Sequence, residues 1–214
     1  MAKLLSALPV GSVVKSTNTK YNGKVIRWIV GTQDTANGRT GLVAEKMITL
    51  KCFDAKESSN TNSDRKNYGN NRYSQSNIDQ WLNSQAASWY SARHSADAPP
   101  NNANVWSNYN EYDTEAGFLS NFEADFRNAI LDAVIRVAKN TVTDGGGYED
   151  ITRKVFLLSN TEVGLSNENS VAEGTLWSYF SSAARRQCYP TAEAVSNSEY
   201  TSSSLNASSY WWWW

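Results

Sequence analysis

Few residues of this chain have the types and spacing that catalysis requires. The single histidine, His94, lies in a Ser/Ala/Asp-rich stretch with no nucleophile motif beside it. Glu111, Asp113 and Glu115 form a cluster of carboxylates that could in principle perform glycosidic chemistry. Acidic residues that alternate in a loop are usually only solvated, so we expect no catalytic residue and no enzymatic activity. One histidine also leaves metal chemistry short of ligands, and we expect no metal site and no cofactor.

Cys52 and Cys188 lie far apart in the sequence and leave two possibilities open. They could pair in a disulfide. Residues 1–9 carry one positive charge and too short an apolar run for a secretory signal. A chain with two cysteines and no such signal more often keeps buried free thiols, which is the interpretation that we favour.

Aromatic side chains are the more informative set: nine Trp, eleven Tyr and six Phe stand in an Asn/Ser-rich background typical of adaptable binding surfaces. Residues 84–116 form a long irregular stretch that is rich in them, and such a loop either packs over a core or is displayed for binding. Packing is the expectation for the loop as a whole, and because sugar rings stack on aromatic faces, its aromatic residues are also the candidates for a ligand site. The candidate ligand-binding residues are Trp89, Tyr90, Trp106, Tyr109 and Tyr112.

The last five residues are aromatic as well. Each tryptophan there would bury roughly 150–250 Å², which a chain cannot leave in water without associating. They could close a core, form a binding platform, or indicate that the molecule continues. In a strand, alternate residues would need cover on opposite faces, so we expect an interrupted core or an interface. The candidate interface residues are Tyr210, Trp211, Trp212, Trp213 and Trp214.

The formal net charge of −1 gives no electrostatic reason to expect nucleic acid or an anionic membrane as a partner. No hydrophobic run approaches the roughly 20 residues of a membrane span.

The elements that must position these residues suggest an α+β fold. Residues 25–30 and 41–48 read as two strands of an antiparallel hairpin, with Asn37-Gly38 as a tight-turn signal between them. A helix starts within residues 74–83, where Ser76 or Asn77 can cap it.

Further along, residues 54–73 are polar and predict a surface loop. Residues 118–139 carry an apolar stripe at helical spacing and predict the clearest helix. Residues 154–159 predict a strand, and a short helix begins within residues 174–180. No linker or repeat interrupts the chain, so we expect one α+β domain over residues 1–214.

Several segments, in order along nearly the whole chain, resemble an uncharacterised domain family of Firmicutes and their phages. Members of that family look related to C-type-lectin-like and sulfatase-modifying-factor folds. The matching segments are LPVGS (8–12), the strand with Trp28, SNIDQWLN (76–83), GFLSNF (117–122), VFLLSNTEV (155–163) and YWW (210–212).

The resemblance implies a C-type-lectin-like mixed fold, with short antiparallel strands, two main helices and long loops. In the family the final aromatic pair is normally followed by Leu-Arg-Ser-Pro and a segment ending in Gly-Val-Arg-Pro. This sequence has neither, so we expect a single lectin-like domain that lacks the usual C-terminal segment. The formylglycine-generating relatives use a cysteine pair near the carboxyl end, where this chain has only Cys188, so catalysis is not carried over.

For function, the resemblance points to a bacteriophage virion component of a tail, fibre or baseplate that binds a bacterial surface glycan or protein. Its partners would be other virion proteins or further copies of itself. Its location would be the virion, outside cells after lysis. The alternative is a structural decoration or connector protein of a phage head or tail. An enzyme of the formylglycine-generating or glycan-acting type is the less favoured reading.

Overall fold

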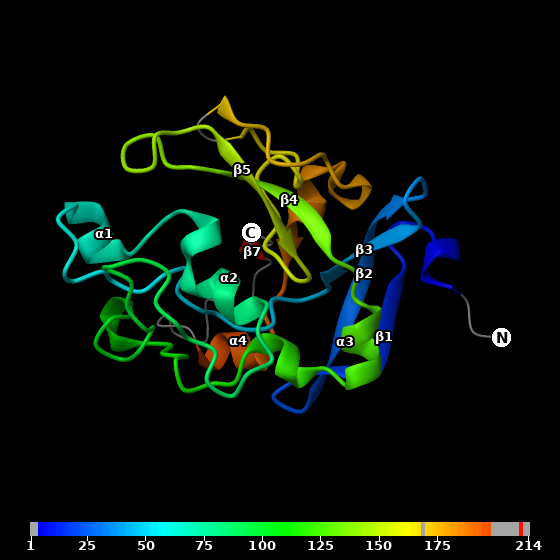
Figure 1. Cartoon of the computed structure of the whole chain (residues 1–214). Coiled ribbons are helices and arrows are strands. Elements are labelled where there is room, and N and C mark those ends of the chain that lie inside the picture. The colour runs from blue at the N-terminus through cyan, green and yellow to red at the C-terminus, as the bar shows by residue number, and fades with distance from the viewer. Residues whose placement is uncertain (1–3, 168–169, 198–209, 212–214) are drawn as a thin grey trace.

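The computed structural model describes residues 4–167, 170–197 and 210–211. The described residues form short helices and antiparallel sheets joined by long loops (Figure 1), which confirms the α+β class. The helices are shorter than expected. Each α-helix in the described part has only five or six residues, so the expectation of two main helices is wrong. These helices are α1 (Ser63–Tyr68), α2 (Asn77–Leu82), α3 (Ala124–Ala129) and α4 (Ala192–Ser196).

The largest sheet forms near the N-terminus. It has three antiparallel strands in the order β1-β2-β3, and β2 pairs Ile29 with Val43 of β3. The turn between β2 and β3 contains Gly38 at φ 64°, a left-handed conformation that glycine adopts without strain. The predicted hairpin is therefore confirmed. The strands are β1 (Val13–Tyr21), β2 (Lys24–Asp34) and β3 (Arg39–Ala44).

Both faces of β2 are covered, which explains why its sequence is apolar without a clear alternation. Ile26 and Trp28 share one face and pack into a cluster of aromatic residues. Ile29 lies on the opposite face, in a second cluster with Val43 and Phe180. The sheet thus separates two cores, and β2 contributes Ile26 and Trp28 to one and Ile29 to the other.

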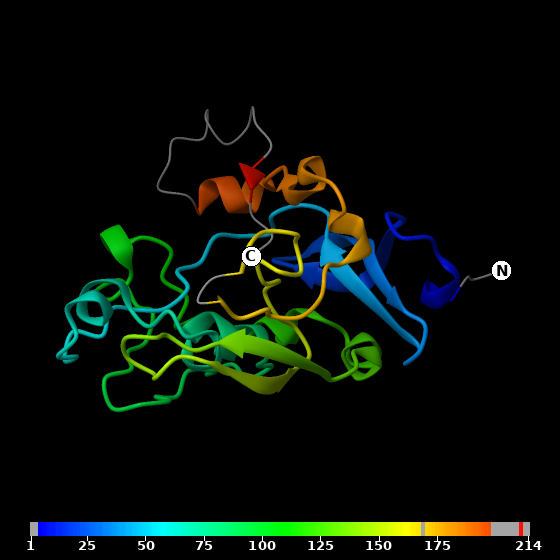
Figure 2. The same ribbon diagram turned by 90° about the horizontal axis from the view of Figure 1, so that it is seen from above.

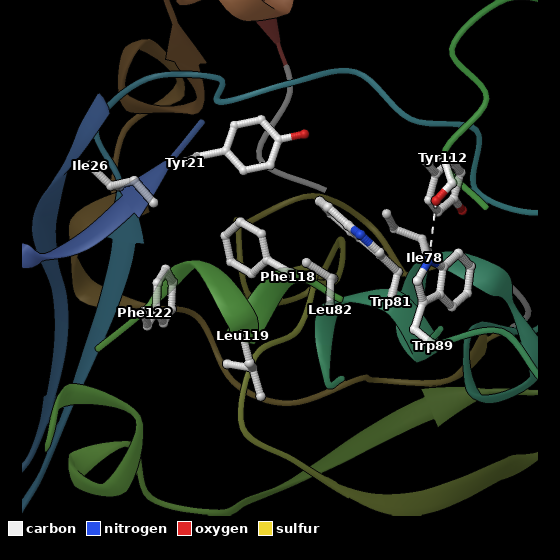
Figure 3. Close-up of a cluster of buried hydrophobic side chains, with 10 residues drawn as sticks. All are labelled: Tyr21, Ile26, Ile78, Trp81, Leu82, Trp89, Tyr112, Phe118, Leu119 and Phe122. Carbon is white, nitrogen blue, oxygen red and sulfur yellow. Dashed lines mark hydrogen bonds between the residues drawn. The ribbon is translucent and has the colours of Figure 1, made fainter. Parts of the chain in front are cut away.

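The aromatic cluster, which we call the aromatic core, joins the sheet to α2 and to the loop that follows α2 (Figure 3). Trp81 is 2% exposed and lies 5.2 Å from the Phe118 ring and 5.7 Å from the Tyr112 ring. Its indole nitrogen donates to the Ala116 carbonyl oxygen, so the polar atom of this buried ring is paired. The buried members are Tyr21, Ile26, Ile78, Trp81, Leu82, Trp89, Tyr112, Phe118, Leu119 and Phe122.

Helix α2 starts where its sequence predicts. The Ser76 hydroxyl accepts a hydrogen bond from the Asp79 backbone N–H, which is the N-cap geometry expected for this residue. Ile78, Trp81 and Leu82 then place the apolar face of the helix in the aromatic core.

The helix expected over residues 118–139 is wrong. A 3-10 helix at Phe118–Asn121 and α3 occupy its first half, and the strand β4 (Ala133–Ala138) occupies its end. Strand β4 forms six register pairs with β5 (Tyr148–Arg153), from Ala133 with Arg153 to Ala138 with Tyr148. The β-branched residues of β4 suit a strand as well as a helix, and pairing with β5 decides between them.

Residues 154–159 do not form the expected strand, because β5 ends immediately before them at Arg153. Side chains satisfy their backbone instead of a neighbouring strand. Asn83 Oδ1 accepts from the N–H groups of Lys154 and Val155, and the Tyr73 hydroxyl accepts from that of Leu157. The segment is therefore extended and fixed without belonging to a sheet.

The remaining elements are short. The segment 174–180 forms only a 3-10 helix at Ser178–Phe180, and the polar stretch 54–73 includes α1, so it is not wholly a loop. Strands β6 (Gln187–Cys188) and β7 (Tyr210–Trp211) pair antiparallel. Further 3-10 helices lie at Leu5–Ala7, Tyr73–Gln75, Trp106–Asn108 and Ala183–Arg186.

Viewed from above, α2 lies between the β4–β5 hairpin on one side and α4 with β7 on the other (Figure 2). In both views α1 lies at the end of the molecule far from the three-stranded sheet (Figures 1 and 2).

Among the described residues, no helix is long and apolar enough to cross a membrane.

Candidate functional site: an exposed aromatic pair

The five aromatic residues proposed for ligand binding occupy different environments. Trp89 and Tyr112 are 4% and 0% exposed, and their rings stack on each other at 5.3 Å with an interplanar angle of 11° (Figure 3). The Trp89 indole nitrogen donates to the Tyr112 carbonyl oxygen, and the Tyr112 hydroxyl donates to the Cys52 carbonyl oxygen. These two residues pack the aromatic core, so their assignment as ligand contacts is corrected.

The other three candidates are more accessible. Tyr90 is half-buried and makes an edge contact with Trp89, and burial raises its hydroxyl pKa to about 12. Tyr109 is 40% exposed, and its hydroxyl donates to the Ser196 carbonyl oxygen at the end of α4. Trp106 is 56% exposed. Of the five, Trp106 therefore presents the most aromatic surface to solvent.

Trp106 has a partner that sequence reasoning missed. Tyr68, the last residue of α1, is 66% exposed, and its ring lies 5.7 Å from that of Trp106 with an interplanar angle of 31°. We call Tyr68 and Trp106 the aromatic platform. In the sequence Tyr68 stands at the end of a polar run. The one local signal for the helix that carries Tyr68 is Asn62, a residue type that caps helices.

The Tyr68 side of the platform is held by both ends of α1. Asn62 Oδ1 accepts from the N–H groups of Asp64 and Arg65 at the start of the helix. Gly69 follows Tyr68 at φ 80°, where a Cβ atom would lie 2.5 Å from the Ala55 carbonyl oxygen. Arg65 also forms a largely buried ion pair with Asp144 at 2.9 Å. The backbone that carries Tyr68 thus has little freedom.

The Trp106 side is held by backbone contacts with residue 56 and by the burial of its neighbour Val105. The Lys56 backbone N–H donates to the Asn104 carbonyl oxygen, and Val105 is fully buried. The Lys56 ammonium group lies 6.0 Å from the centre of a Trp106 ring, within the range of a cation–π contact. Asn102 and Asn108, both exposed, stand four residues before and two residues after Trp106 in the sequence. The platform therefore combines two aromatic faces with nearby hydrogen-bonding groups.

A buried acidic layer connects α1 to α2 through residues 54–57. Asp54 is 6% exposed and accepts from the backbone N–H groups of Asn70 (2.7 Å) and Asn77 (2.8 Å). Glu57 is fully buried, its N–H donates to the Arg65 carbonyl oxygen, and its Oε1 lies 3.3 Å from His94 Nε2. Burial raises the pKa of the Asp54 carboxyl to about 7, against the opposing effect of its two backbone hydrogen bonds.

This pKa shift predicts a loss of stability between pH 5 and pH 7. The carboxyl has an ordinary pKa of 3.8, so across this window the folded protein keeps a proton that the unfolded chain has released. The free energy of unfolding should fall by about 2 kcal/mol as the pH rises over these two units, because the folded carboxyl is itself half ionised at pH 7. Urea denaturation at pH 5 and pH 7 measures this difference. In Asp54→Asn the difference should shrink by about that amount, and an unchanged pH dependence in the variant would contradict the assignment.

Of the residues considered for catalysis, Glu115 and His94 have side-chain neighbours in the fold, whereas Glu111 is exposed and Asp113 half-buried. Glu115 pairs with Lys51 and also accepts from the Tyr21 hydroxyl. His94 lies beside the fully buried Glu57, at the 3.3 Å given above. Within the described ranges, no group of three or more His, Cys, Asp or Glu residues could hold a metal ion. The two cysteines are free thiols, Cys188 buried and Cys52 half-buried.

The C-terminal candidate residues are described only in part. Strand β7 pairs the backbone of Tyr210 with Cys188 and that of Trp211 with Gln187. The expectation that this stretch enters the fold as a strand is thus confirmed for these two residues. Trp212, Trp213 and Trp214 lie outside the described residues, and the interface expected there stays a prediction.

Fold and site together define an α+β structure whose aromatic platform joins the last residue of α1 to the 3-10 helix that starts at Trp106. Residues 37–214 match the family described as "Domain of unknown function (DUF6273)", and the chain belongs to that family. The search of the curated proteins and the search of solved structures each returned no match.

Proposed function

We propose that the protein is a binding module for the bacterial surface and, of the two ligand classes expected, a glycan or a protein, that it recognises a glycan through the aromatic platform. The observation that carries the proposal is the pair of exposed rings, Tyr68 at 66% and Trp106 at 56%, held 5.7 Å apart. Two large aromatic side chains left side by side in solvent lose the free energy that burial would give them. A binding surface accounts for that loss.

A sugar ring is the ligand that suits such a pair. The C–H groups of a pyranose face carry partial positive charge and stack on the negative face of an aromatic ring. The platform rests on a capped helix and a pinned loop, so little conformational entropy is lost when a ligand binds. The Lys56 ammonium and the amides of Asn102 and Asn108 can supply hydrogen bonds to hydroxyl groups at its edge.

The resemblance to a family of Firmicutes and their phages places this activity, in our proposal, on a virion. The module would belong to a tail, fibre or baseplate, have a C-type-lectin-like fold and act in attachment to the host surface. Other virion proteins or further copies of the chain would hold it on the particle.

The test is binding to isolated Gram-positive cell walls and to a glycan array. Wild-type protein should be retained, and Trp106→Ala and Tyr68→Ala should each reduce affinity by about tenfold or more, because each ring contributes one stacking face. Tyr148→Ala is the matched control, since Tyr148 is an equally exposed aromatic residue (51%) on the β4–β5 hairpin. It should bind as wild type does.

Two results would overturn the proposal. One is full binding by Trp106→Ala, and the other is a wild-type protein that binds neither the walls nor any glycan on the array. An equal loss in Tyr148→Ala would also count against it, because it would point to a general loss of exposed aromatic surface.

The alternative role as a decoration or connector protein is favoured by a different surface. Leu131, Val134 and Tyr148 are 57%, 70% and 51% exposed in and beside the β4–β5 hairpin. Exposed apolar residues of this kind suit an interface between subunits. The variant Val134→Asp separates the two roles: it should dissociate the defined oligomer of a connector, whereas a binding module should keep its affinity for glycan.

A further inference from the structure

A second site lies on another part of the molecule, where an open hollow of about 440 Å³ separates the end of α2 from the end of β5. We call it the basic hollow. Arg93, Arg153 and Lys154 line it together with Asp132 and the edge of Trp89. The hollow shares no residue with the aromatic platform, and the inference drawn from it goes beyond the proposed glycan binding.

Two of the three cations are held in place by one buried carboxylate. Asp79 is fully buried; its Oδ1 accepts from Arg153 Nε at 2.6 Å, and its Oδ2 accepts from Arg153 Nη2 at 2.7 Å and Arg93 Nη1 at 2.8 Å. Arg93 and Arg153 keep 24% and 21% of their side chains exposed. One carboxylate therefore fixes two guanidinium groups at the wall of the hollow and neutralises only one of their charges.

Lys154 adds a third positive charge at the rim. Its ammonium donates to the Ile130 carbonyl oxygen at 2.8 Å and lies 3.3 Å from Asp132, and its side chain is 38% exposed. The three cations face two carboxylates, Asp79 and Asp132, so the hollow keeps one positive charge in excess.

Arg93 has N–H donors left for a ligand. Both hydrogen bonds that the Arg93 side chain makes within the described part of the chain leave from Nη1, to Asp79 and to the Ser74 carbonyl oxygen. Its Nε and Nη2 are thus available. The side-chain amides that line the hollow already have hydrogen-bond partners. That of Gln80 donates to Ser91, and that of Asn83 donates to the Val155 carbonyl oxygen and accepts from the Lys154 N–H. N–H donors with excess positive charge are the chemistry that recognises an oxyanion.

We propose that the basic hollow binds a phosphate or carboxylate group, through Arg93 and Lys154, with Arg153 contributing charge. Arg93 offers the edge of its guanidinium and Lys154 an ammonium across the opening. Asp132 opposes the ligand by repulsion and by competing for Lys154.

Titration calorimetry in low-salt buffer tests this proposal, with inorganic phosphate as one probe and glucuronate as the other. The wild-type protein should bind at least one of them with a dissociation constant of about 1 mM or below, more weakly as salt increases. Binding of phosphate alone would assign the site to phosphate groups, and binding of glucuronate alone would assign it to carboxylates.

Two variants at the rim keep the fold intact, because neither touches Asp79. Lys154→Gln should weaken binding about fivefold, and Asp132→Asn should strengthen it by a similar factor, because each changes the charge next to the anion by one unit. Lys66→Gln on α1 is the control and should bind as wild type does.

Absence of heat with both probes at about 10 mM would overturn the proposal. So would a weaker affinity in Asp132→Asn, because a carboxylate that helps binding is incompatible with an oxyanion ligand beside it.

Discussion

Asp79→Ala is expected to lower the free energy of unfolding by about 3–5 kcal/mol. Asp79 is fully buried and is the common acceptor for Arg93, from the loop after α2, and for Arg153, at the end of β5. Removal of the carboxylate leaves two partly buried guanidinium groups without their counter-charge. It also removes the main polar contact that holds β5 against α2, so urea denaturation should show a large decrease in the midpoint.

The matched control is Asp150→Ala. Asp150 accepts two hydrogen bonds from Arg136, at 2.9 and 3.0 Å, in the same paired geometry that Asp79 makes with Arg153. The side chains of Arg136 and Asp150 are 39% and 44% exposed, and solvent screens an ion pair at such a position. The urea midpoint of Asp150→Ala should therefore stay close to that of the wild-type protein. An equal loss of unfolding free energy in Asp79→Ala and Asp150→Ala would show that the burial of Asp79 does not determine how much it stabilises the fold.

Trp89→Ala is expected to cost about 3–5 kcal/mol of stability, as large aromatic truncations in a core do. The indole is 4% exposed, stacks on Tyr112 at 5.3 Å and donates its N–H to the Tyr112 carbonyl oxygen. The truncation would open a cavity between α2 and the loop and leave that carbonyl oxygen without its partner. Thermal or urea unfolding measures the loss.

Trp106→Ala is the comparison, because Trp106 lies in the same aromatic loop but is 56% exposed. Its truncation should change the free energy of unfolding by no more than about 1 kcal/mol. If Trp106→Ala destabilised the protein as much as Trp89→Ala, the division of this loop into core and displayed residues would be wrong.

The parts of the fold that the sequence predicts correctly are those with local signals. The Asn37-Gly38 turn and the apolar strands around it define the β2–β3 hairpin, and Ser76 marks the start of α2. Each of these signals acts over a few residues, so it does not depend on how the chain folds elsewhere.

Predictions that depend on distant partners fail. Residues 133–138 suit the helical stripe and a strand equally well, and only β5 selects the strand. Residues 154–159 look like a strand because they are apolar. Their backbone is bound by side chains of Asn83 and Tyr73, more than 70 residues away, which no periodicity reveals.

The candidate sites show the same contrast between local signals and contacts that only the folded chain makes. Composition drew attention to the loop of residues 84–116, yet Trp89 and Trp106 look alike in sequence, and burial separates them only in the folded chain. Tyr68 was missed because its contact with Trp106 joins α1 to a loop 38 positions further along. Asp79 was read only as a helix residue, although it organises the charges of the basic hollow.

The most direct test of the central claim is an NMR titration of protein labelled with ¹⁵N at its tryptophan indoles, with soluble glycan released from Gram-positive cell walls as the ligand. The platform predicts that the Trp106 indole signal shifts and saturates while the signals of Trp81 and Trp89, whose rings are buried, stay in place. A Trp106 signal that stays unchanged while the glycan binds would contradict the assignment of the aromatic platform as the glycan site.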